Sequence, residues 1–474
     1  MLVSVLGLAA LGAGPVVQAA PNPAAEAAKA RVVKHWTPER RAAAIPRDLV
    51  IDPRGLGYLK MPDGSLRPYG HDVAATPFAG PPNSGDSTPP NIVMNSPAEG
   101  AEIGTSATFS ADITDSSGIK SVSFVILYPN GSTTQSFTPA QTAGTDTWST
   151  TLQGFSDGDW AWSVTAKDSA GKGGNTATTD FSGFTVNSGG GSSGNNTGGN
   201  GDTVVNGHWS YGGGVQTAAG RIYFEMPSNA KLKGPWNGYV CSGTVVTDET
   251  AGRSVILTAA HCVYDDANKA FAKNVLFIPN QDETTGSGTD LNCNNDPLGC
   301  WIPEFGVVDA NWTTSTFPDN IPWDYAHYVV LDESLEVDAG SLPLSFDPPV
   351  VDDGTDGAGS PDFTHALGYS YSDDPNFMYC AEDMTTEGTD NWWLPSCGLS
   401  GGSSGGPWVQ PMDTSTGSGA VISVNSWGYT TSPGMAGPKL AGTSASCVFE
   451  EAKMNLDDWS GVADGEAGVA IICE

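Results

Sequence analysis

Apolar and polar residues alternate most regularly between residues 90 and 187. The run SVSFVILYP at 121–129 puts its apolar side chains on one face of a strand, and WAWSVTA at 160–166 repeats the pattern. The side chains predicted to share a face are Val122, Phe124, Ile126 and Tyr128 in the first run and Trp160, Trp162 and Val164 in the second. Because turn signals such as Asp157-Gly158 separate such runs, we expect a β-sandwich over residues 90–187.

Other segments have different patterns. Residues 203–474 hold short β-type runs between long polar loops, and the 60 Gly and 33 Pro among 474 residues favour a turn-rich, all-β protein. Residues 188–202 have the Gly/Ser-rich composition of a flexible linker. Residues 20–89 are rich in Ala, Pro and Arg with little apolar periodicity, which predicts a pro-segment or spacer.

The first 19 residues form an uncharged apolar run that ends in small residues. They predict a secretory signal peptide cut after Ala19, although the usual basic start is missing. The alternative is a retained membrane anchor, which the Gly14-Pro15 break disfavours. We therefore expect a secreted, extracellular protein with no membrane contact after the signal is removed.

Charge is unevenly distributed along the chain. The formal net charge is −33, yet residues 1–90 carry nine basic and seven acidic side chains, against eight basic and thirty-six acidic from residue 203 onward. Nucleic acids and anionic membranes bind clustered Lys and Arg, so neither is expected as a partner. This difference in charge between the N-terminal and C-terminal parts is what a removable leader and an exported catalytic part would have. We expect the exported protein to be monomeric.

All eight cysteines lie after residue 240. An even number in one segment predicts disulfides made in an oxidising compartment. Zinc is the competing use, but the sequence has no CxxC pair. Spacing does not fix the connectivity, and sequential pairing is the working hypothesis for Cys241, Cys262, Cys293, Cys300, Cys380, Cys397, Cys447 and Cys473.

Two stretches contain candidates for proton transfer. RSVILTAAHCV at 253–263 is an apolar strand running into His261, which a neighbouring disulfide would hold rigidly. IPWDYAHYVVL at 321–331 leads Asp324 into an apolar strand, where a buried carboxylate needs a hydrogen-bond donor such as an imidazole N–H. The alternatives are an ordinary core or surface histidine and an aspartate that caps a turn.

The third stretch is GGSSGGPW at 401–408, which could be a flexible linker or a tight turn around a nucleophile. A nucleophilic serine needs a base and backbone N–H groups directed at the oxyanion, and glycines permit such a turn. Because Pro407-Trp408-Val409 leads straight into a β-type run, we expect an anchored loop rather than a linker.

Together, TAAHC, WDYAHYVV and GSSGGP resemble the three motifs of the trypsin/chymotrypsin-like serine proteases, in the family's order. The resemblance covers about residues 204–445 and implies two six-stranded antiparallel β-barrels. It implies that His261 is the general base, Asp324 its orienting acid and Ser404 the nucleophile. The sequence departs from the family at Ser403, which stands where the family usually has Asp, and at 325–327, where Tyr-Ala-His stands in place of the common Ile-Ala-Leu.

The resemblance also implies roles for neighbouring residues. The backbone N–H groups of Gly402 and Ser404 would form the oxyanion hole, and NSWGY matches the substrate-binding strand. Ser426, Trp427 and Gly428 would then hold the substrate backbone, although plain core packing is the alternative for Trp427. Cys241 and Cys262 match the disulfide that flanks the family's histidine. DGDWAWSVTAKDSAGK at 157–172 resembles bacterial immunoglobulin-like modules, which suggests a spacer or surface-binding accessory.

Chain order excludes two rival hydrolases. Residues 402–406 also fit the GxSxG elbow of α/β-hydrolases, but that fold places its histidine after the serine, and the last histidine here is His365. GTSAS at 442–446 resembles a subtilisin serine motif, but no matching histidine motif precedes it.

The family's spacing puts Gly398 and Leu399 at the pocket for the residue before the cleaved bond, P1. No acid lies there, and Asn425 stands where glutamate-specific relatives carry histidine, so we expect an uncharged, medium-sized or apolar P1 residue. The acidic loops DLNCNNDPLGC and VDDGTDGAGSPD do not fit EF-hand spacing, and we expect neither a metal nor a cofactor.

The sequence therefore predicts a secreted serine endopeptidase, made as a precursor, that acts on proteins or peptides. The alternative is a catalytically silent, protease-like binding protein that acts through the immunoglobulin-like module. VVNG at 204–207 resembles the family's mature N-terminus, but Ser403 offers no charge to pair with a freed α-amine. We expect cleavage near residue 203 to release the enzyme or remove a blocking segment, without building the site through a terminal ion pair.

Overall fold

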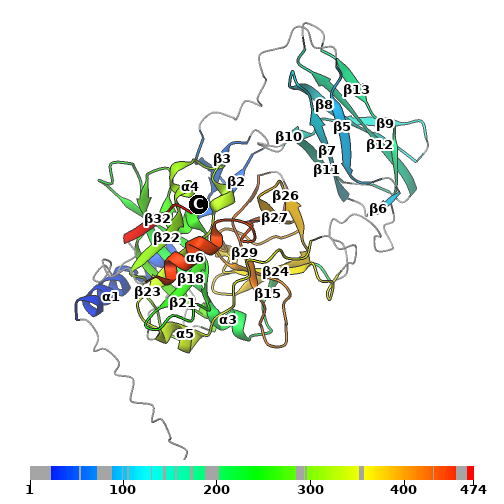
Figure 1. Ribbon diagram of the computed structural model, residues 1–474. Coiled ribbons are helices and arrows are strands. Elements are labelled where there is room, and N and C mark those ends of the chain that lie inside the picture. The colour runs from blue at the N-terminus through cyan, green and yellow to red at the C-terminus, as the bar shows by residue number, and fades with distance from the viewer. Residues whose placement is uncertain are drawn as a thin grey trace, which may run out of the picture.

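The computed structural model in Figure 1 describes residues 23–52, 55–71, 88–98, 100–103, 106–129, 131–141, 146–153, 155–156, 158–170, 174–186, 202–283, 293, 296–351, 357–430, 432–454 and 467–473. The predicted signal peptide and nearly all of the predicted linker lie outside these residues. None of the helices in this part of the chain is both long enough and apolar enough to cross a lipid bilayer.

Strands dominate the described chain, as the sequence predicts, and the helices are short. The α-helices are α1 (Pro23–His35), α2 (Pro38–Ala42), α3 (Gly214–Ala218), α4 (Ala310–Thr314), α5 (Ser334–Ala339) and α6 (Ala445–Lys453). The 3-10 helices are η1 (Ala260–Cys262), η2 (Gln281–Glu283), η3 (Ile321–Trp323) and η4 (Tyr371–Asp373).

Two antiparallel-rich sheets between residues 91 and 186 share one apolar core. In spatial order the first contains β10 (Ala140–Gln141), β11 (Thr147–Gln153), β7 (Ser106–Thr114) and β5 (Asn91–Ser96). The second contains β6 (Ala101–Ile103), β14 (Ser182–Val186), β12 (Gly158–Asp168), β8 (Ile119–Leu127) and β9 (Thr134–Phe137), with β13 (Thr176–Thr178) beside β12. Figure 1 shows these strands in cyan and blue-green.

The predicted inward faces of this region are confirmed for the two long strands. Phe124 and Trp162 are fully buried on β8 and β12, and their rings meet edge to face at 5.3 Å between centroids. Tyr128 lies just beyond the end of β8 and is only half-buried. Alternation with a period of two therefore identified which side chains form this core.

Three further sheets make up most of the C-terminal part. One contains, in order, β21 (Lys273–Pro279), β16 (Ala219–Pro227), β17 (Trp236–Val246), β18 (Ser254–Thr258), β23 (Ala326–Val330), β22 (Phe305–Asp309) and β32 (Ala467–Ile471). A second contains β15 (Val204–His208), β25 (Met378–Asp383), β24 (Phe363–Gly368), β28 (Pro407–Val409) and β29 (Val421–Val424). The third begins with β26 (Thr385–Glu387), β27 (Asn391–Leu394), β31 (Met435–Pro438) and β30 (Trp427–Tyr429), and β19 (Tyr264–Asp265) and β20 (Ala270–Phe271) form a separate pair.

Sequential pairing of the cysteines is confirmed. The four disulfides are Cys241–Cys262, Cys293–Cys300, Cys380–Cys397 and Cys447–Cys473. The first joins β17 to η1, and the last joins α6 to the end of the chain beyond β32. Each cross-link limits the freedom of the unfolded chain.

The segment predicted to be a pro-segment or spacer is folded onto the C-terminal part, which rules out a simple spacer for residues 23–71. β1 (Ile45–Pro46) pairs with β17, and β2 (Asp48–Ile51), β3 (Gly57–Lys60) and β4 (Leu66–Pro68) extend the third sheet from β30. The side chains of Val32 and Trp36 are buried against the outer face of β16, β17 and β21. Weak apolar periodicity did not predict this, because the contacts that attach the segment join residues far apart in the chain, Ile45 with Tyr239 and Leu49 with Trp427.

Candidate active site

A histidine and an aspartate from distant parts of the chain meet in the core. The apolar strand β18 is followed by η1, which carries His261, and Asp324 directly follows η3. The backbone N–H of His261 donates to Asp324 Oδ1 at 2.8 Å, and Nδ1 lies 2.7 Å from Oδ2. Both side chains are fully buried, so the carboxylate fixes the ring's position and makes Nδ1 the protonated nitrogen.

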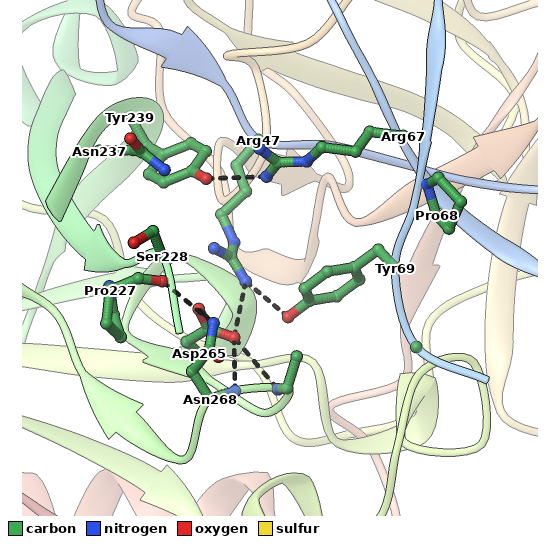
Figure 2. Close-up of a pocket in the computed structure, with 12 residues that line it drawn as sticks. Arg47, Arg67, Pro68, Tyr69, Pro227, Ser228, Asn237, Tyr239, Asp265 and Asn268 are labelled. Atoms are coloured by element: carbon green, nitrogen blue, oxygen red, sulfur yellow. Dashed lines mark hydrogen bonds and ion pairs between the residues drawn. The ribbon is translucent and has the colours of Figure 1, made fainter. Parts of the chain in front are cut away.

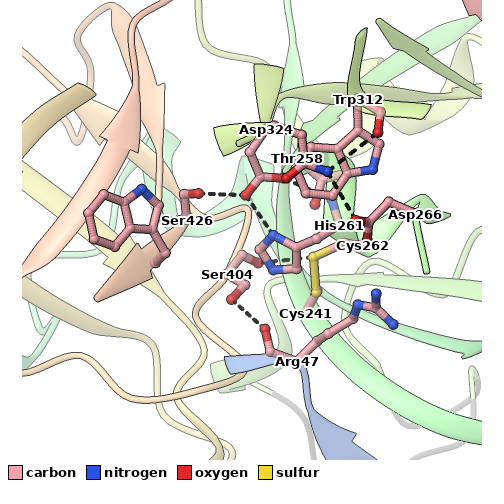
Figure 3. Close-up of polar contacts among 12 residues, drawn as sticks. Arg47, Cys241, Thr258, His261, Cys262, Asp266, Trp312, Asp324, Ser404 and Ser426 are labelled. Carbon is pink, nitrogen blue, oxygen red and sulfur yellow. Dashed lines mark hydrogen bonds and ion pairs between the residues drawn. A yellow bond between two sulfur atoms is a disulfide. The ribbon is translucent and has the colours of Figure 1, made fainter. Parts of the chain in front are cut away.

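A third donor reaches the same carboxylate. The Ser426 hydroxyl, at the start of the predicted substrate-binding strand, donates to Asp324 Oδ2, as Figure 3 shows. Asp324 therefore accepts hydrogen bonds from two side chains and one backbone amide, which offset the cost of burying its charge. The sequence predicted Ser426 as a substrate contact and did not predict this role.

The loop that carries Ser404 is a tight turn, as its composition predicts. Gly402 and Gly405 have φ values of +96° and +81°, a region that favours glycine. A Cβ on Gly405 would lie 2.1 Å from Thr258 Oγ1 and 2.4 Å from the carbonyl oxygen of Ser242, so no side chain fits there. The linker alternative for this stretch is therefore wrong.

Two buried polar residues hold this loop in place. The Ser242 hydroxyl donates to the Gly402 carbonyl at 2.8 Å, and the Ser242 N–H donates to the Ser404 carbonyl at 2.7 Å. Asn425 Nδ2 donates to the Ser403 carbonyl at 3.1 Å and to the Leu367 carbonyl at 2.7 Å. These roles were not predictable from the sequence, because a single Ser or Asn in a β-type run has no periodic pattern of its own.

Ser403 does not hold the loop through its own hydroxyl. Its Oγ is buried and has no hydrogen-bond partner within the described residues. The loop is held instead by hydrogen bonds from Ser242 and Asn425 to its backbone carbonyls. The side chain of Asn425, considered above for specificity, faces this loop and accepts from Trp408 Nε1 at 2.8 Å.

The candidate nucleophile faces the N-terminal segment. Ser404 Oγ donates to the backbone carbonyl of Arg47 at 3.1 Å, and only 4% of Ser404 is exposed (Figure 3). The Nε2 atom of His261 is buried without a hydrogen-bond partner in the described part of the chain. The structure thus brings all three predicted catalytic residues into one region. The Ser404 hydroxyl donates its hydrogen bond to the Arg47 carbonyl and not to His261.

The predicted substrate-contact residues have different surroundings. Trp427 and Gly428 pair with Leu49 and Val50 through β30 and β2, so residues of the chain itself cover this strand. The Gly398 N–H donates to the carbonyl of Val205 at 2.7 Å. Leu399 is 7% exposed and belongs to the apolar cluster around the Cys380–Cys397 disulfide, so its side chain is a core group.

One group of metal-type ligands lies at the site. Cys241, Cys262 and His261 place their ligand atoms within 4.8 Å of one another. The two sulfurs are joined in a disulfide, and the ring of His261 faces Asp324. The arrangement is therefore explained without a metal ion.

Known proteins offer little guidance. No family model and no curated protein matches the sequence. Among solved structures, an endo-β-1,4-mannanase from Thermotoga petrophila is 17% identical over 22% of this chain and 21% of its own, with a TM-score of 0.18. Fibronectin(III)-like modules of Clostridium thermocellum CbhA are 16% identical over 21% of this chain and 97% of theirs, with a TM-score of 0.15. These TM-scores are too low to inform fold or function.

Proposed function

We propose that the chain is a secreted serine endopeptidase, made as a precursor, that hydrolyses peptide bonds in proteins through a covalent acyl-enzyme. In this proposal residues 203–474 form two six-stranded β-barrels of the trypsin/chymotrypsin-like type, and residues 90–187 form an immunoglobulin-like β-sandwich. The observation that carries it is the contact of a buried His261–Asp324 pair with Ser426, beside a glycine turn that presents Ser404.

The residues support a definite sequence of steps. With the cleft open, His261 Nε2 takes the proton of Ser404 while Oγ attacks the carbonyl carbon of the peptide bond. The N–H groups of Gly402 and Ser404 stabilise the developing oxyanion. His261 then gives the proton to the leaving amine, and water cleaves the ester by the same steps in reverse order. Asp324 holds the ring and stabilises its charged form throughout.

Covalent labelling tests the nucleophile. We expect a fluorophosphonate probe to label the full chain and to leave Ser404→Ala unlabelled. Ser403→Ala is the matched control, because the neighbouring hydroxyl makes no hydrogen bond within the described residues and its loss should not change labelling. Labelling of Ser404→Ala at the parent rate would show that the nucleophile assignment is wrong, and no labelling of any variant would favour the silent binding protein.

For specificity, we propose an uncharged, medium-sized or apolar P1 residue, because neither Gly398 nor Leu399 supplies a charge. Digestion of a peptide library by the activated protein, read by mass spectrometry, should give cuts mainly after such residues. A dominant cut after Arg, Lys or Glu would contradict this.

For maturation, we propose that a cut near residue 203 does not build the site through a terminal ion pair. Ser403 has no charge, and the loop is already held by Ser242 and Asn425. Protein processed to begin at Val204 should match the activity of protein that keeps a few residues before it. Activity that depends on a free amine at Val204 would refute this.

A further inference from the structure

The segment 44–52 crosses the candidate active site in an extended conformation. Its first part, β1, runs parallel to β17, and the Arg47 N–H donates to the Val240 carbonyl at 3.3 Å. Its second part, β2, runs parallel to β30, with Leu49 beside Trp427 and Ile51 beside Tyr429. The backbone of this segment therefore adds to a strand on each side of Ser404, as a bound peptide does.

The orientation of the central peptide group is unsuited to cleavage. Ser404 directs its O–H at the carbonyl oxygen of Arg47, so a hydrogen and not a lone pair faces the peptide. Attack requires the reverse: the Oγ lone pair near the carbonyl carbon and the oxygen among the oxyanion N–H donors. The proposed base is also not in contact with the nucleophile's proton, since His261 Nε2 makes no hydrogen bond to any described residue.

The side chain of Arg47 points away from Ser404 and anchors the segment in a pocket (Figures 2 and 3). Its guanidinium lies 5.1 Å from the ring of Tyr69 and 5.3 Å from that of Tyr239, an arrangement that suits a planar cation. Its Nη2 donates to the Tyr69 hydroxyl at 2.6 Å and lies 3.9 Å from Asp265 Oδ1. Arg47 is 1% exposed, so the cation is almost completely removed from water.

The pocket is lined by residues of both the N-terminal segment and the C-terminal part. Tyr69 belongs to the N-terminal segment and donates to Asp266 of the C-terminal part, while Arg67 of the segment donates to the Tyr239 hydroxyl at 2.9 Å. A cavity of about 390 Å³ lies beside these side chains. The surface that the C-terminal part contributes, with the ring of Tyr239 and the carboxylate of Asp265, fits an arginine side chain.

The charges of the two parts also favour docking of the N-terminal segment on the C-terminal part. The strongly acidic part from residue 203 onward would attract an N-terminal segment with a basic excess. Away from the cleft, Lys29 and Asp332 form an ion pair and His35 Nε2 lies 2.9 Å from Glu225 Oε1, and both contacts connect the two parts.

We propose that the active-site cleft has an inhibitory binding mode for an extended, arginine-bearing segment, and that residues 44–52 of this chain are its ligand. The segment closes the site by pairing with β17 and β30 and turns its carbonyl away from attack. It is held by Arg47, whose guanidinium contacts Tyr69, Tyr239 and Asp265. This inference rests on the proposed function, because it assumes that Ser404 is the reactive group.

The first test uses the full chain. We expect Arg47→Ala to raise the rate of fluorophosphonate labelling at Ser404 by about tenfold or more, since truncating a buried, hydrogen-bonded cation weakens docking by more than one power of ten. Arg47→Lys, which keeps the charge but not the planar group, should give a smaller increase. Arg40→Ala is the matched control, because Arg40 is an exposed arginine of α2 that lies outside residues 44–52, and its loss should leave the labelling rate unchanged.

The second test adds the ligand separately. A synthetic peptide with the sequence of residues 43–52 should slow labelling of the Arg47→Ala chain and remain uncleaved, whereas the same peptide with Ala in place of Arg should have little effect. If Arg47→Ala does not fold, Arg47→Lys takes its place. Equal labelling of parent and folded Arg47 variants would overturn the inhibitory mode and leave the proposed enzyme standing, whereas no labelling of any protein would remove the proposed function itself.

Discussion

At the scale of single residues, Asp324 determines what His261 can do. Three donors converge on its two oxygens: the His261 backbone N–H, the His261 ring and the Ser426 hydroxyl. Only a carboxylate presents acceptors on both atoms. An amide has one acceptor and places an N–H₂ group against the remaining donors.

Asp324→Asn tests this arrangement. The amide would favour the ring tautomer with its proton on Nε2, which cannot act as a base toward Ser404. We expect the second-order rate constant for peptide hydrolysis by the activated protein to fall by about 10⁴-fold at neutral pH. Circular dichroism should show an unchanged fold, and a loss below tenfold would argue against His261 as the base.

The sequence predicted His261, Asp324 and Ser404 as neighbours because each lies in a short motif whose residue types suit its proposed chemistry. It missed Ser242 and Asn425, which support the loop through backbone carbonyls. Such contacts depend on where the fold brings a carbonyl, and the sequence around Asn425 does not contain that information. The burial of Leu399 was not predictable for the same reason, since burial is a property of the surrounding sheets.

At the scale of elements, the glycine loop depends on Asn425, which lies in the short connection between β29 and β30. The Asn425 side chain makes three hydrogen bonds in the core, to the carbonyls of Leu367 and Ser403 and from Trp408 Nε1. The Gly405 N–H also donates to the Asn425 carbonyl at 2.8 Å. A single residue thus connects the loop, β24 and β28.

Asn425→Ala should therefore be strongly destabilising. Three buried polar groups would lose their partners, which costs about 3 kcal/mol or more of unfolding free energy. Urea unfolding followed by circular dichroism measures this. Asn311→Ala, at an exposed position of α4, is the control and should change the free energy by less than about 0.5 kcal/mol. A similarly small effect at Asn425 would mean that the loop holds itself.

Elements were predicted well where their pattern is local and poorly where a partner defines them. β8 and β12 alternate over nine and eleven residues, and that period is visible in the sequence. β1 and β2 have only two and four residues, and they join the C-terminal part by pairing with β17 and β30, strands far along the chain. Pairing through backbone hydrogen bonds leaves little pattern in the residue types, so the sequence did not distinguish these strands from a spacer.

At the scale of the whole molecule, buried ionisable groups give opposing dependences on pH. Burial lowers the pKa of His327 to about 3 and that of His365 to about 4. Burial raises the pKa of Glu304 and that of Glu382 to about 7. The histidines bind protons more readily in the unfolded chain, so their contribution to stability is lost as pH falls below about 6.5. The glutamates act in the opposite sense, and their contribution is lost as pH rises from about 4.5 to 7.

His327 gives the cleanest test of this balance, because its side chain is 1% exposed and neither ring nitrogen has a hydrogen-bond partner in the described residues. At pH 7.5 the imidazole is neutral in both states, so His327→Leu should show only the effect of altered packing against Phe449. At pH 5 the unfolded parent gains a proton at this position and the folded parent does not. The free energy of unfolding of the variant, relative to the parent, should therefore rise by about 2 kcal/mol between pH 7.5 and pH 5. Urea unfolding of both proteins at the two pH values measures this difference, and a difference that does not change with pH would show that His327 is protonated in the folded chain.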